Sequence, residues 1–346
     1  MTKRKLPTKP ALDFETTSAL IDAAARSSNT ERAYDQATKH FVLAGGKLPA
    51  TEEMVDRYIR LFAGTLSVST LQLRVAAIAH WHRKFGFPDP TKGKIKSTLK
   101  GLRVAFNKPP KKALPLAIQN LRAMVAYLDA EQRAGIEAQD ERRRLAASRN
   151  RAILLLGFWR AFRSDELCRL EAQFITVISG REMHIFLSKA KNDRDAKGQR
   201  FIVPALEDLC PVRAYTHWLE DSRIQQGPVF RSISRWGALG KTGLTTASIA
   251  PILRSLARGA GLDEQYTSHS LRHGFANWAV DQGWNLNSLM QYVGWKSMPN
   301  AQGYLVPKYD FGDLAIHQPA SLSSRHWERG SGEVYSAVAQ RIEADE

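Results

Sequence analysis

Cysteine is scarce in this sequence. The 346 residues include only Cys168 and Cys210. Two thiols are too few for a disulfide framework, and they are too few for a cysteine-based zinc site. We therefore expect a protein that works in a reducing cytoplasm and carries no metal.

Long apolar runs are also missing. The densest, AILLLGFW at 152–159, has the length of a core helix and is far from the roughly 20 residues that cross a bilayer. The N-terminal stretch MTKRKLPTKPALDFETT has no apolar run after its basic residues, unlike a secretory signal. We expect no contact with a membrane, a cytoplasmic location and a basic tail over residues 1–13.

Acidic residues are few beside basic ones. The chain has 34 Asp and Glu against 50 Lys and Arg, which gives a net charge of +16 and a pI near 9.9. The positive charge is spread along the chain, and a field of this sign attracts polyanions. This favours a protein that binds nucleic acid over one that is merely soluble and basic.

Helical periodicity runs through residues 14–106. A capping signal at Asn29 or Thr30 precedes one predicted helix, Thr51 caps the next, and Gly86 ends a third. DPTKGKIKSTLKGLRVAF then predicts a short basic helix. We expect an all-helical domain over this part of the chain.

The last of these predicted helices carries a basic stripe, and a basic linker follows it. The stripe consists of Lys92, Lys96, Lys100 and Arg103. It is either a solvated face or a phosphate-binding one, and in so basic a chain we favour phosphate. The next stretch, NKPPKKALPL at 107–116, contains prolines that cannot continue a helix. A basic hinge between two domains suits a clamp on DNA.

The second predicted domain, residues 117–327, is mixed. RAILLLGFWRAFRSDELCRLEA predicts one long apolar helix. REMHIFLSKAKNDRDAKGQRFIVPAL alternates, turns at 195–198 and alternates again, which predicts a β-hairpin. Further helices follow, and the apolar stripe of the last, over 328–346, must be buried somewhere. The expected fold class is mainly α with a small antiparallel sheet (α+β).

One set of residues is not explained by the packing of two helices against each other. His269 and Arg272 lie three residues apart on one helix face, Trp295 follows, and Tyr304 comes nine residues later. A site that holds and attacks a phosphate needs a nucleophile and guanidinium groups that bind its non-bridging oxygens. His-x-x-Arg alone occurs by chance in many proteins.

The chain resembles the tyrosine recombinase (phage integrase) family. HSLRH, GW and GYL, beginning at residues 269, 294 and 303, fit its C-terminal signature in order and spacing. RSDEL places Arg163 three residues before Glu166, and SKAKNDRDAKG supplies the lysines of its β-hairpin. These motifs extend over about residues 115–305. The helical region that contains NTERAY is similar to the family's core-binding (SAM-like) domain.

Two of the family's residues have competitors here. Arg160 precedes Arg163 by one helical turn, but the glutamate three residues later selects Arg163. Lys189 and Lys191 alternate onto the same strand face, so the pattern alone does not separate them. Lys191 lies closer to the turn and matches the family's spacing better, and we prefer it.

The nucleophile and the tryptophan also allow other interpretations. Tyr309 and Tyr292 compete with Tyr304, and the interval from GW to the tyrosine favours Tyr304. Trp295 stands where many relatives have histidine. Its indole N–H can donate a hydrogen bond to phosphate or to the tyrosine but cannot relay a proton.

The resemblance implies covalent chemistry on DNA. The tyrosine attacks the scissile phosphate and forms a 3′-phosphotyrosyl link, two arginines hold the phosphorane, and a lysine protonates the departing 5′ oxygen. The bond energy stays in the covalent link, so neither ATP, metal nor another cofactor is expected. The catalytic set is Tyr304, Arg163, Lys191, His269, Arg272 and Trp295, with Glu166 and His273 in support.

The resemblance also implies an assembly and a substrate. Two domains would form a C-shaped clamp on double-stranded DNA with inverted binding arms, and four protomers would bring two duplexes together. Candidates for contact with DNA are Lys96, Lys100, Arg103, Thr245, Thr246 and Ser248. The expected role is integration, excision or resolution of a mobile element or replicon of bacterial or phage origin. A type IB topoisomerase, a DNA-binding regulator with a decayed site and a telomere resolvase are the alternatives.

Overall fold

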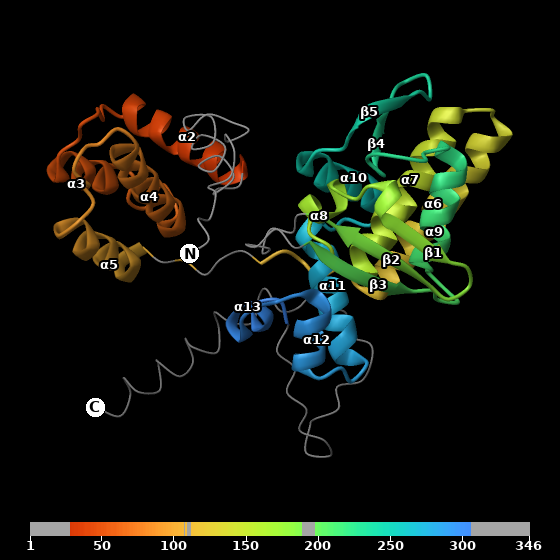
Figure 1. Cartoon of the computed structure of the whole chain (residues 1–346). Coiled ribbons are helices and arrows are strands. Elements are labelled where there is room, and N and C mark those ends of the chain that lie inside the picture. The colour runs from red at the N-terminus through yellow and green to blue at the C-terminus, as the bar shows by residue number, and fades with distance from the viewer. Residues whose placement is uncertain (1–27, 107, 109–111, 189–197, 306–346) are drawn as a thin grey trace, which may run out of the picture.

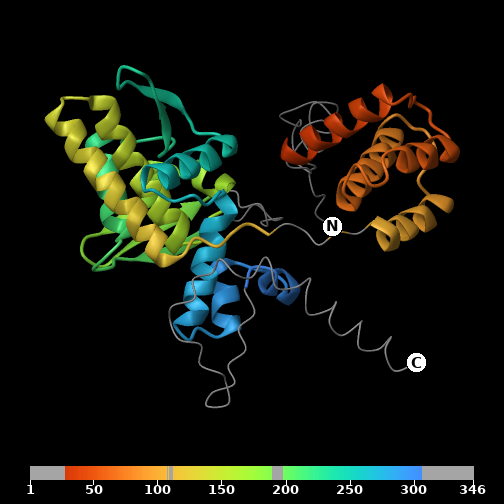
Figure 2. The same cartoon turned by 180° about the vertical axis from the view of Figure 1, so that it is seen from behind.

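The computed structural model describes residues 28–106, 108, 112–188 and 198–305. Its elements form two groups that stand apart in Figures 1 and 2, and each group buries a hydrophobic core of its own. The described part is mostly helical with two small antiparallel sheets, which confirms the expected fold class. Within it, no helix is both long and apolar enough to cross a membrane.

The first group contains four helices: α2 (Ser28–Leu43), α3 (Glu52–Leu61), α4 (Val68–Lys84) and α5 (Lys94–Phe106). Helix α2 packs along α4, and α3 packs along α5. The predicted cap Thr51 accepts a hydrogen bond from the backbone N–H of Met54. After α4 ends, Gly86 takes a left-handed φ of 74°.

Helix α2 begins before its predicted cap. Ser28 is already helical, so Asn29 and Thr30 lie in the first turn and do not precede it. The predicted cap was wrong by two or three residues, because periodicity fixes the packed face of a helix better than its end.

In the second group, α6 (Ile118–Glu137) packs against α7 (Glu141–Trp159). The prediction of one continuous helix over 151–172 was wrong, because α7 ends at Trp159. Ala161 takes a positive φ of 52°, and a short helix α8 (Ser164–Cys168) starts anew. Arg163 is the extended cap of α8, and the Glu166 carboxylate accepts its backbone N–H at 2.7 Å. This capping interaction replaces the helical bonds lost at the break and turns Arg163 out of the helix.

The predicted hairpin is present as two strands of a three-stranded sheet. The strands of this sheet are β1 (Ile175–Ile178), β2 (Glu182–Leu187) and β3 (Gln199–Pro204), in that order. The predicted hairpin consists of β2 and β3. Met183 pairs with Val203, and both are fully buried, as the alternation predicts. Residues 189–197 of the turn that joins β2 to β3 lie outside the described residues, and Gly198, which precedes β3, has a φ of +73°.

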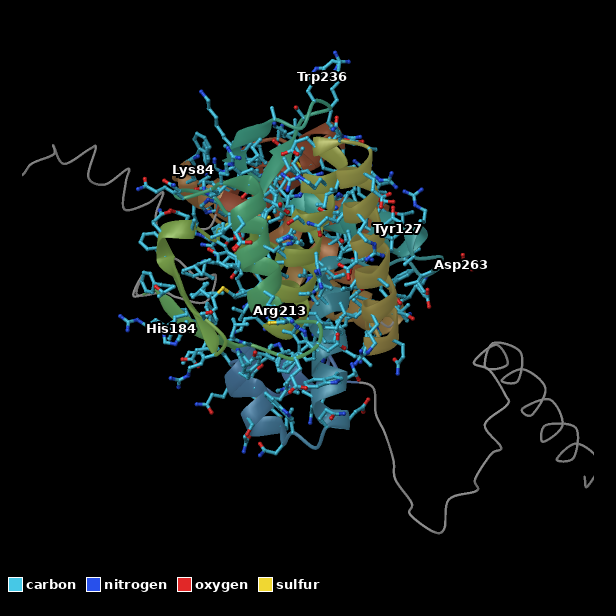
Figure 3. The ribbon with its side chains drawn as sticks, turned by 90° about the vertical axis from the view of Figure 1, so that its right-hand side faces the viewer. Lys84, Tyr127, His184, Arg213, Trp236 and Asp263 are labelled. Atoms are coloured by element: carbon cyan, nitrogen blue, oxygen red, sulfur yellow. The ribbon has the colours of Figure 1, made fainter. Side chains whose placement is uncertain are left out.

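A second hairpin, β4 (Arg231–Ile233) and β5 (Leu239–Gly243), was not predicted. Its turn carries Trp236, which is 78% exposed and stands out at the rim of the molecule in Figure 3. Strands this short give too little alternation to separate them from a loop.

The remaining helices complete the second core: α9 (Pro211–Ser222), α10 (Thr246–Gly259), α11 (Ser268–Asp281), α12 (Leu286–Val293) and α13 (Met298–Gln302). Helix α11 runs from this core to α12 and α13, as Figure 1 shows. The linker segment at Leu116 is tied to α11 through its backbone N–H, which donates to the Ser270 carbonyl at 3.0 Å. The predicted tail at 1–13 and the predicted helix at 328–346 lie outside the described residues.

Candidate active site

Four segments of the second group meet at one site. They are the α7–α8 turn with Arg163, the first turns of α11, the Gly294–Trp295 turn after α12, and Tyr304 after α13. Helix α11 can approach the linker closely because it has a glycine at position 274. A Cβ atom there would lie 2.2 Å from the Leu116 carbonyl oxygen. Arg272 lies two residues earlier on the same helix, on the side that faces the carbonyls of Ala161 and Val293.

Arg272 is almost fully buried, with 1% of its surface exposed. Its Nη1 donates to the carbonyl of Ala161 at 2.7 Å, and its Nη2 donates to the carbonyl of Val293 at 2.9 Å. Burial, and then the positive charge of Arg163, lowers the pKa of Arg272 to about 10. The guanidinium group therefore stays charged at neutral pH.

Arg163 is paired with the glutamate of its own motif. Its Nη1 lies 2.7 Å from Oε1 of Glu166, whose side chain is only 7% exposed, whereas the side chain of Arg163 is 24% exposed. Because the carboxylate also accepts the backbone N–H of Arg163, it fixes both ends of that residue. A partly open guanidinium held in this way can bind an anion.

Tyr304 is surrounded by rings and cations. Its hydroxyl lies 3.4 Å from Nδ1 of His269, which makes the imidazole its hydrogen-bond partner. Its ring lies 4.3 Å from the ring of His273 and 5.0 Å from that of Trp295, measured between centroids. The guanidinium carbon of Arg272 lies 5.8 Å from its centroid.

The backbone of Tyr304 is held by two side chains of α11. Nδ1 of His273 and the amide of Asn277 each donate to the Tyr304 carbonyl at 3.1 Å. Burial, reinforced by nearby positive charge, lowers the pKa of His273 in spite of that bond, which keeps the ring neutral at physiological pH. Sequence reasoning missed Asn277. Its position one helical turn after His273 was the available signal.

Some of the buried donors at this site are unused. The indole N–H of Trp295 and the Nε groups of Arg272 and Arg160 are buried and lack hydrogen-bond partners among the described residues. An unsatisfied buried donor costs about 1–3 kcal/mol, so the donors of Trp295 and Arg272 favour an acceptor that binds from outside. Trp295 does not bond to the tyrosine hydroxyl, one of its two expected partners.

A cavity of about 300 Å³ opens beside these groups. Its lining includes three cations, Arg160, Arg163 and Lys296, against one acid, Glu166. This excess of positive charge suits a phosphate diester. Sequence reasoning missed Lys296 and the cavity-lining role of Arg160, because neither belongs to a recognised motif.

Both candidate lysines, Lys189 and Lys191, lie outside the described residues. Strand β2 ends at Leu187, and Gly198 and Gln199, where β3 begins, line the cavity. The structure therefore brings the base of the hairpin to the site and leaves the choice of lysine as a prediction.

The competing tyrosines are in different situations. The Tyr292 hydroxyl donates to the Trp159 carbonyl at 2.8 Å, and burial raises the pKa of Tyr292. Both effects disfavour Tyr292 as a nucleophile. Tyr309 lies outside the described residues.

The candidate DNA-contacting residues are separate from the cavity. Lys96, Lys100 and Arg103 are exposed on α5. Thr245 caps α10 and Thr246 opens it, both exposed, whereas Ser248 is half-buried and its hydroxyl lies 3.2 Å from that of Thr245.

Comparison with known proteins gives the family. Residues 126–310, more than half of the chain, match the model of the phage integrase family. An integrase/recombinase XerD homolog of Selenomonas ruminantium is 29% identical over 278 residues, 78% of each protein. The tyrosine recombinase XerC of Brucella suis biovar 1 is 27% identical over 291 residues, 80% of this chain and 84% of that protein.

Solved structures show the same fold. A lambda integrase dimer bound to a COC′ core site superimposes with a TM-score of 0.54 at 12% identity, covering 87% of this chain and 79% of that one. The Tn1549 transposon integrase in complex with transposon right end DNA gives 0.56 at 12% identity, covering 85% and 94%.

Family and fold together define an enzyme that breaks and rejoins DNA. The chain belongs to the phage integrase family, that of the tyrosine recombinases.

Proposed function

We propose that the protein is a site-specific recombinase whose nucleophile is Tyr304. The observation that carries this proposal is the placement of the Tyr304 hydroxyl 3.4 Å from His269, with its ring against Trp295 and Arg272. A phosphate at this point meets a nucleophile, a base and fixed positive charge together.

The proposed reaction balances without a cofactor. The Tyr304 oxygen forms a bond to phosphorus while the bond from phosphorus to the 5′ oxygen breaks, which gives a 3′-phosphotyrosyl link and a free 5′ hydroxyl. Lys191 supplies the proton to that oxygen, and His269 takes the phenolic proton. A 5′ hydroxyl of a partner strand then reverses the step and exchanges strands.

The other site residues have distinct proposed roles. Arg163 and Arg272 neutralise the non-bridging oxygens, and the indole N–H of Trp295 donates to one of them. Glu166 orients Arg163, to which it is bonded at two places. His273 holds the backbone of Tyr304.

The proposed substrate is double-stranded DNA with inverted binding arms, held between a helical core-binding domain at 14–106 and a catalytic domain at 117–327. The separate cores of the two groups and the linker at 107–116 support a clamp of this kind. Lys96, Lys100 and Arg103 would contact phosphates, and Thr245, Thr246 and Ser248 would contact base edges.

The proposed active form is a tetramer that joins two such sites. The helix predicted at 328–346 would dock on a neighbouring protomer. The enzyme would integrate, excise or resolve a mobile element or replicon in the cytoplasm of a bacterial cell, at its nucleoid.

The first test is a nicked DNA substrate that traps the covalent intermediate. Wild-type protein should give a protein–DNA adduct on a denaturing gel, and Tyr304→Phe should give none while binding DNA normally, because only the phenolic oxygen is lost. Tyr309→Phe is the matched control and should retain the adduct. An undiminished adduct in Tyr304→Phe would overturn the assignment of the nucleophile. A recombinase should also form recombinant product from DNA that carries two sites, whereas a topoisomerase would only relax supercoiled DNA.

A further inference from the structure

Arg160 is a buried cation at the site that the proposed mechanism does not use. It caps the C-terminus of α7 and is 7% exposed. Its guanidinium carbon lies 4.5 Å from the ring centroid of Phe201 on β3 and 4.3 Å from that of Tyr292 on α12. Aromatic rings therefore cover two sides of the guanidinium group.

Arg160 is also bonded into the end of α12. Its Nη1 donates to the Tyr292 carbonyl, and in return the Tyr292 hydroxyl donates to the carbonyl of Trp159 at 2.8 Å. The next carbonyl, that of Val293, is taken by Arg272. Two arginines thus satisfy the last two carbonyls of α12, where the helix dipole favours positive charge.

This contact bears directly on the position of the indole. Immediately after Val293 the chain turns through Gly294, with a φ of 75°, into Trp295. Because the backbone N–H groups of Gly294 and Trp295 both donate to the Met290 carbonyl at 2.9 Å, the end of α12 determines where Trp295 lies.

On its other side Arg160 meets the returning strand of the hairpin. Phe201 lies two residues after Gln199, which lines the cavity, and its ring packs against Phe162 at 5.2 Å. Phe201 therefore connects the base of the hairpin to the α7–α8 turn that carries Arg163.

We propose that Arg160 is a positioning residue that holds the base of the β2–β3 hairpin and the Gly294–Trp295 turn at a fixed separation across the cavity. The proposal rests on the proposed function, because the hairpin is taken to deliver the acid for the leaving 5′ oxygen. Without Arg160, β3 loses the contact with α12 that this side chain provides, and the acid no longer reaches that oxygen in a single geometry.

Direct contact of Arg160 with the phosphate is the less suitable role. Its Nη1 is used by a carbonyl and two rings cover the group, whereas the side chain of Arg163 is 24% exposed. Arginine suits the positioning role because a planar, delocalised cation can stack between two rings and donate at its edge. Lysine cannot do both.

The test uses Arg160→Lys in the full chain and two nicked substrates, one with the natural 5′ oxygen and one with sulfur in its place. On the natural substrate, formation of the adduct should slow by roughly 10- to 100-fold, less than the full loss of a general acid because the acid is misaligned and not removed. On the sulfur substrate the rate should return to within about threefold of wild type, because a thiolate leaves without a proton. Affinity for DNA should be unchanged.

A second variant and a matched control exclude a loss of folding. Phe201→Leu keeps apolar bulk but removes one ring from the guanidinium group, and it should show the same sulfur rescue with a smaller defect. Arg149→Lys changes another buried arginine of α7, which donates to the Arg231 carbonyl at 2.9 Å. It should lower the melting temperature without a sulfur-sensitive loss of rate.

Two results would overturn the proposal. A defect of Arg160→Lys that sulfur leaves unchanged would make Arg160 a residue of the fold alone. A defect rescued by a methylphosphonate, which lacks one charged oxygen, would make Arg160 a phosphate ligand. A wild-type protein that forms no adduct on any substrate would instead contradict the proposed function itself.

Discussion

The arginines at this site differ in what their guanidinium groups contact. Arg272 uses both terminal nitrogens on carbonyls from two different segments, Ala161 and Val293, and keeps Nε unbonded. Arg163 uses one nitrogen on a carboxylate and remains partly open. The first arrangement joins two segments and fixes a charge between them, and the second leaves hydrogens for an incoming oxyanion.

In the proposed mechanism, the positive charge that stabilises the transition state comes from the protein itself. Cleavage should therefore persist in excess EDTA, because Arg163 and Arg272 supply the positive charge that a metal ion would otherwise supply. The check is a cleavage time course with and without the chelator. Loss of activity that magnesium restores would contradict this mechanism.

The two hairpin lysines can be separated by the chemistry of the leaving group. Lys191→Ala should slow cleavage of ordinary DNA by about 10²- to 10⁴-fold, the usual contribution of a general acid. It should have a much smaller effect when the scissile 5′ oxygen is replaced by sulfur. Lys189→Ala is the matched control. If it shows the rescue and Lys191→Ala does not, the acid is Lys189.

How far the sequence could predict the site depended on whether a residue's partners are close in the chain. His269 and Arg272 share one helix face, and the sequence itself shows the nine-residue interval from Trp295 to Tyr304. The structure therefore brings together residues that the sequence pattern had grouped. The contact of Arg160 with Tyr292 joins positions 132 apart. No local pattern encodes such a contact.

At the level of elements, apolar periodicity located helices better than it located their ends. It continued across the α7–α8 break because Ala161 and Phe162 are both buried there, so hydrophobicity gave no sign of the turn. The break is stabilised by the hydrogen bond from the Arg163 backbone N–H to the Glu166 carboxylate, which a hydrophobic pattern does not report. Strand β1 was missed because it alternates between half-buried and exposed positions and buries none fully.

In the first group, one carboxylate joins two helices. Asp56 on α3 accepts hydrogen bonds from Arg60 at 2.8 Å and from Thr98 on α5 at 2.6 Å. The bonds to Arg60 and then Thr98 lower the pKa of Asp56 from 3.8 to about 2. The side chain is 9% exposed, but that of Arg60 is 65% exposed, so solvent screens the ion pair and the Thr98 bond matters more.

Asp56→Asn should loosen the packing of α5 on α3. We expect a loss of about 1–2 kcal/mol at pH 7, the range for a hydrogen bond to a charged group after screening. Because the folded pKa is depressed, the carboxylate's contribution is fully present above pH 3.8 and is lost as the pH falls toward 2. The difference from wild type should therefore shrink over that window.

Hydrogen exchange of α3 and α5, followed by mass spectrometry in the full chain, is the measurement. Asp35→Asn is the matched control, an exposed carboxylate on α2 that makes no ion pair within the described part of the chain. A difference that stays constant down to pH 2 would show that the amide disturbs packing rather than charge.

For the whole molecule, the net charge of +16 and two separately packed cores are the dominant features. The charge gives affinity for any duplex, and that affinity should fall steeply with salt because counterions are released on binding. Sequence preference then has to come from a few contacts, such as those proposed for the start of α10. Selection of paired sites needs a further interaction between protomers.

The segment after Tyr304 is the best candidate for that interaction. In the sequence, Val334, Ala337, Val338 and Ile342 fall on one stripe of the helix predicted at 328–346. An amphipathic helix has to bury its stripe, either on its own domain or on a neighbouring protomer. Only the second choice makes the binding of one protomer depend on the next.

Deleting residues 328–346 should therefore leave binding to a single arm nearly intact and abolish cooperative binding to paired arms. Gel shifts with one-arm and two-arm DNA measure both quantities in the same preparation. A variant that keeps the full length but replaces Val338 and Ile342 with serine is the matched control for chain length, and it should reproduce the loss because it removes the apolar stripe. Cooperativity that survives both changes would mean that the helix packs on its own domain, and the contacts between protomers would have to be sought on the first group of helices.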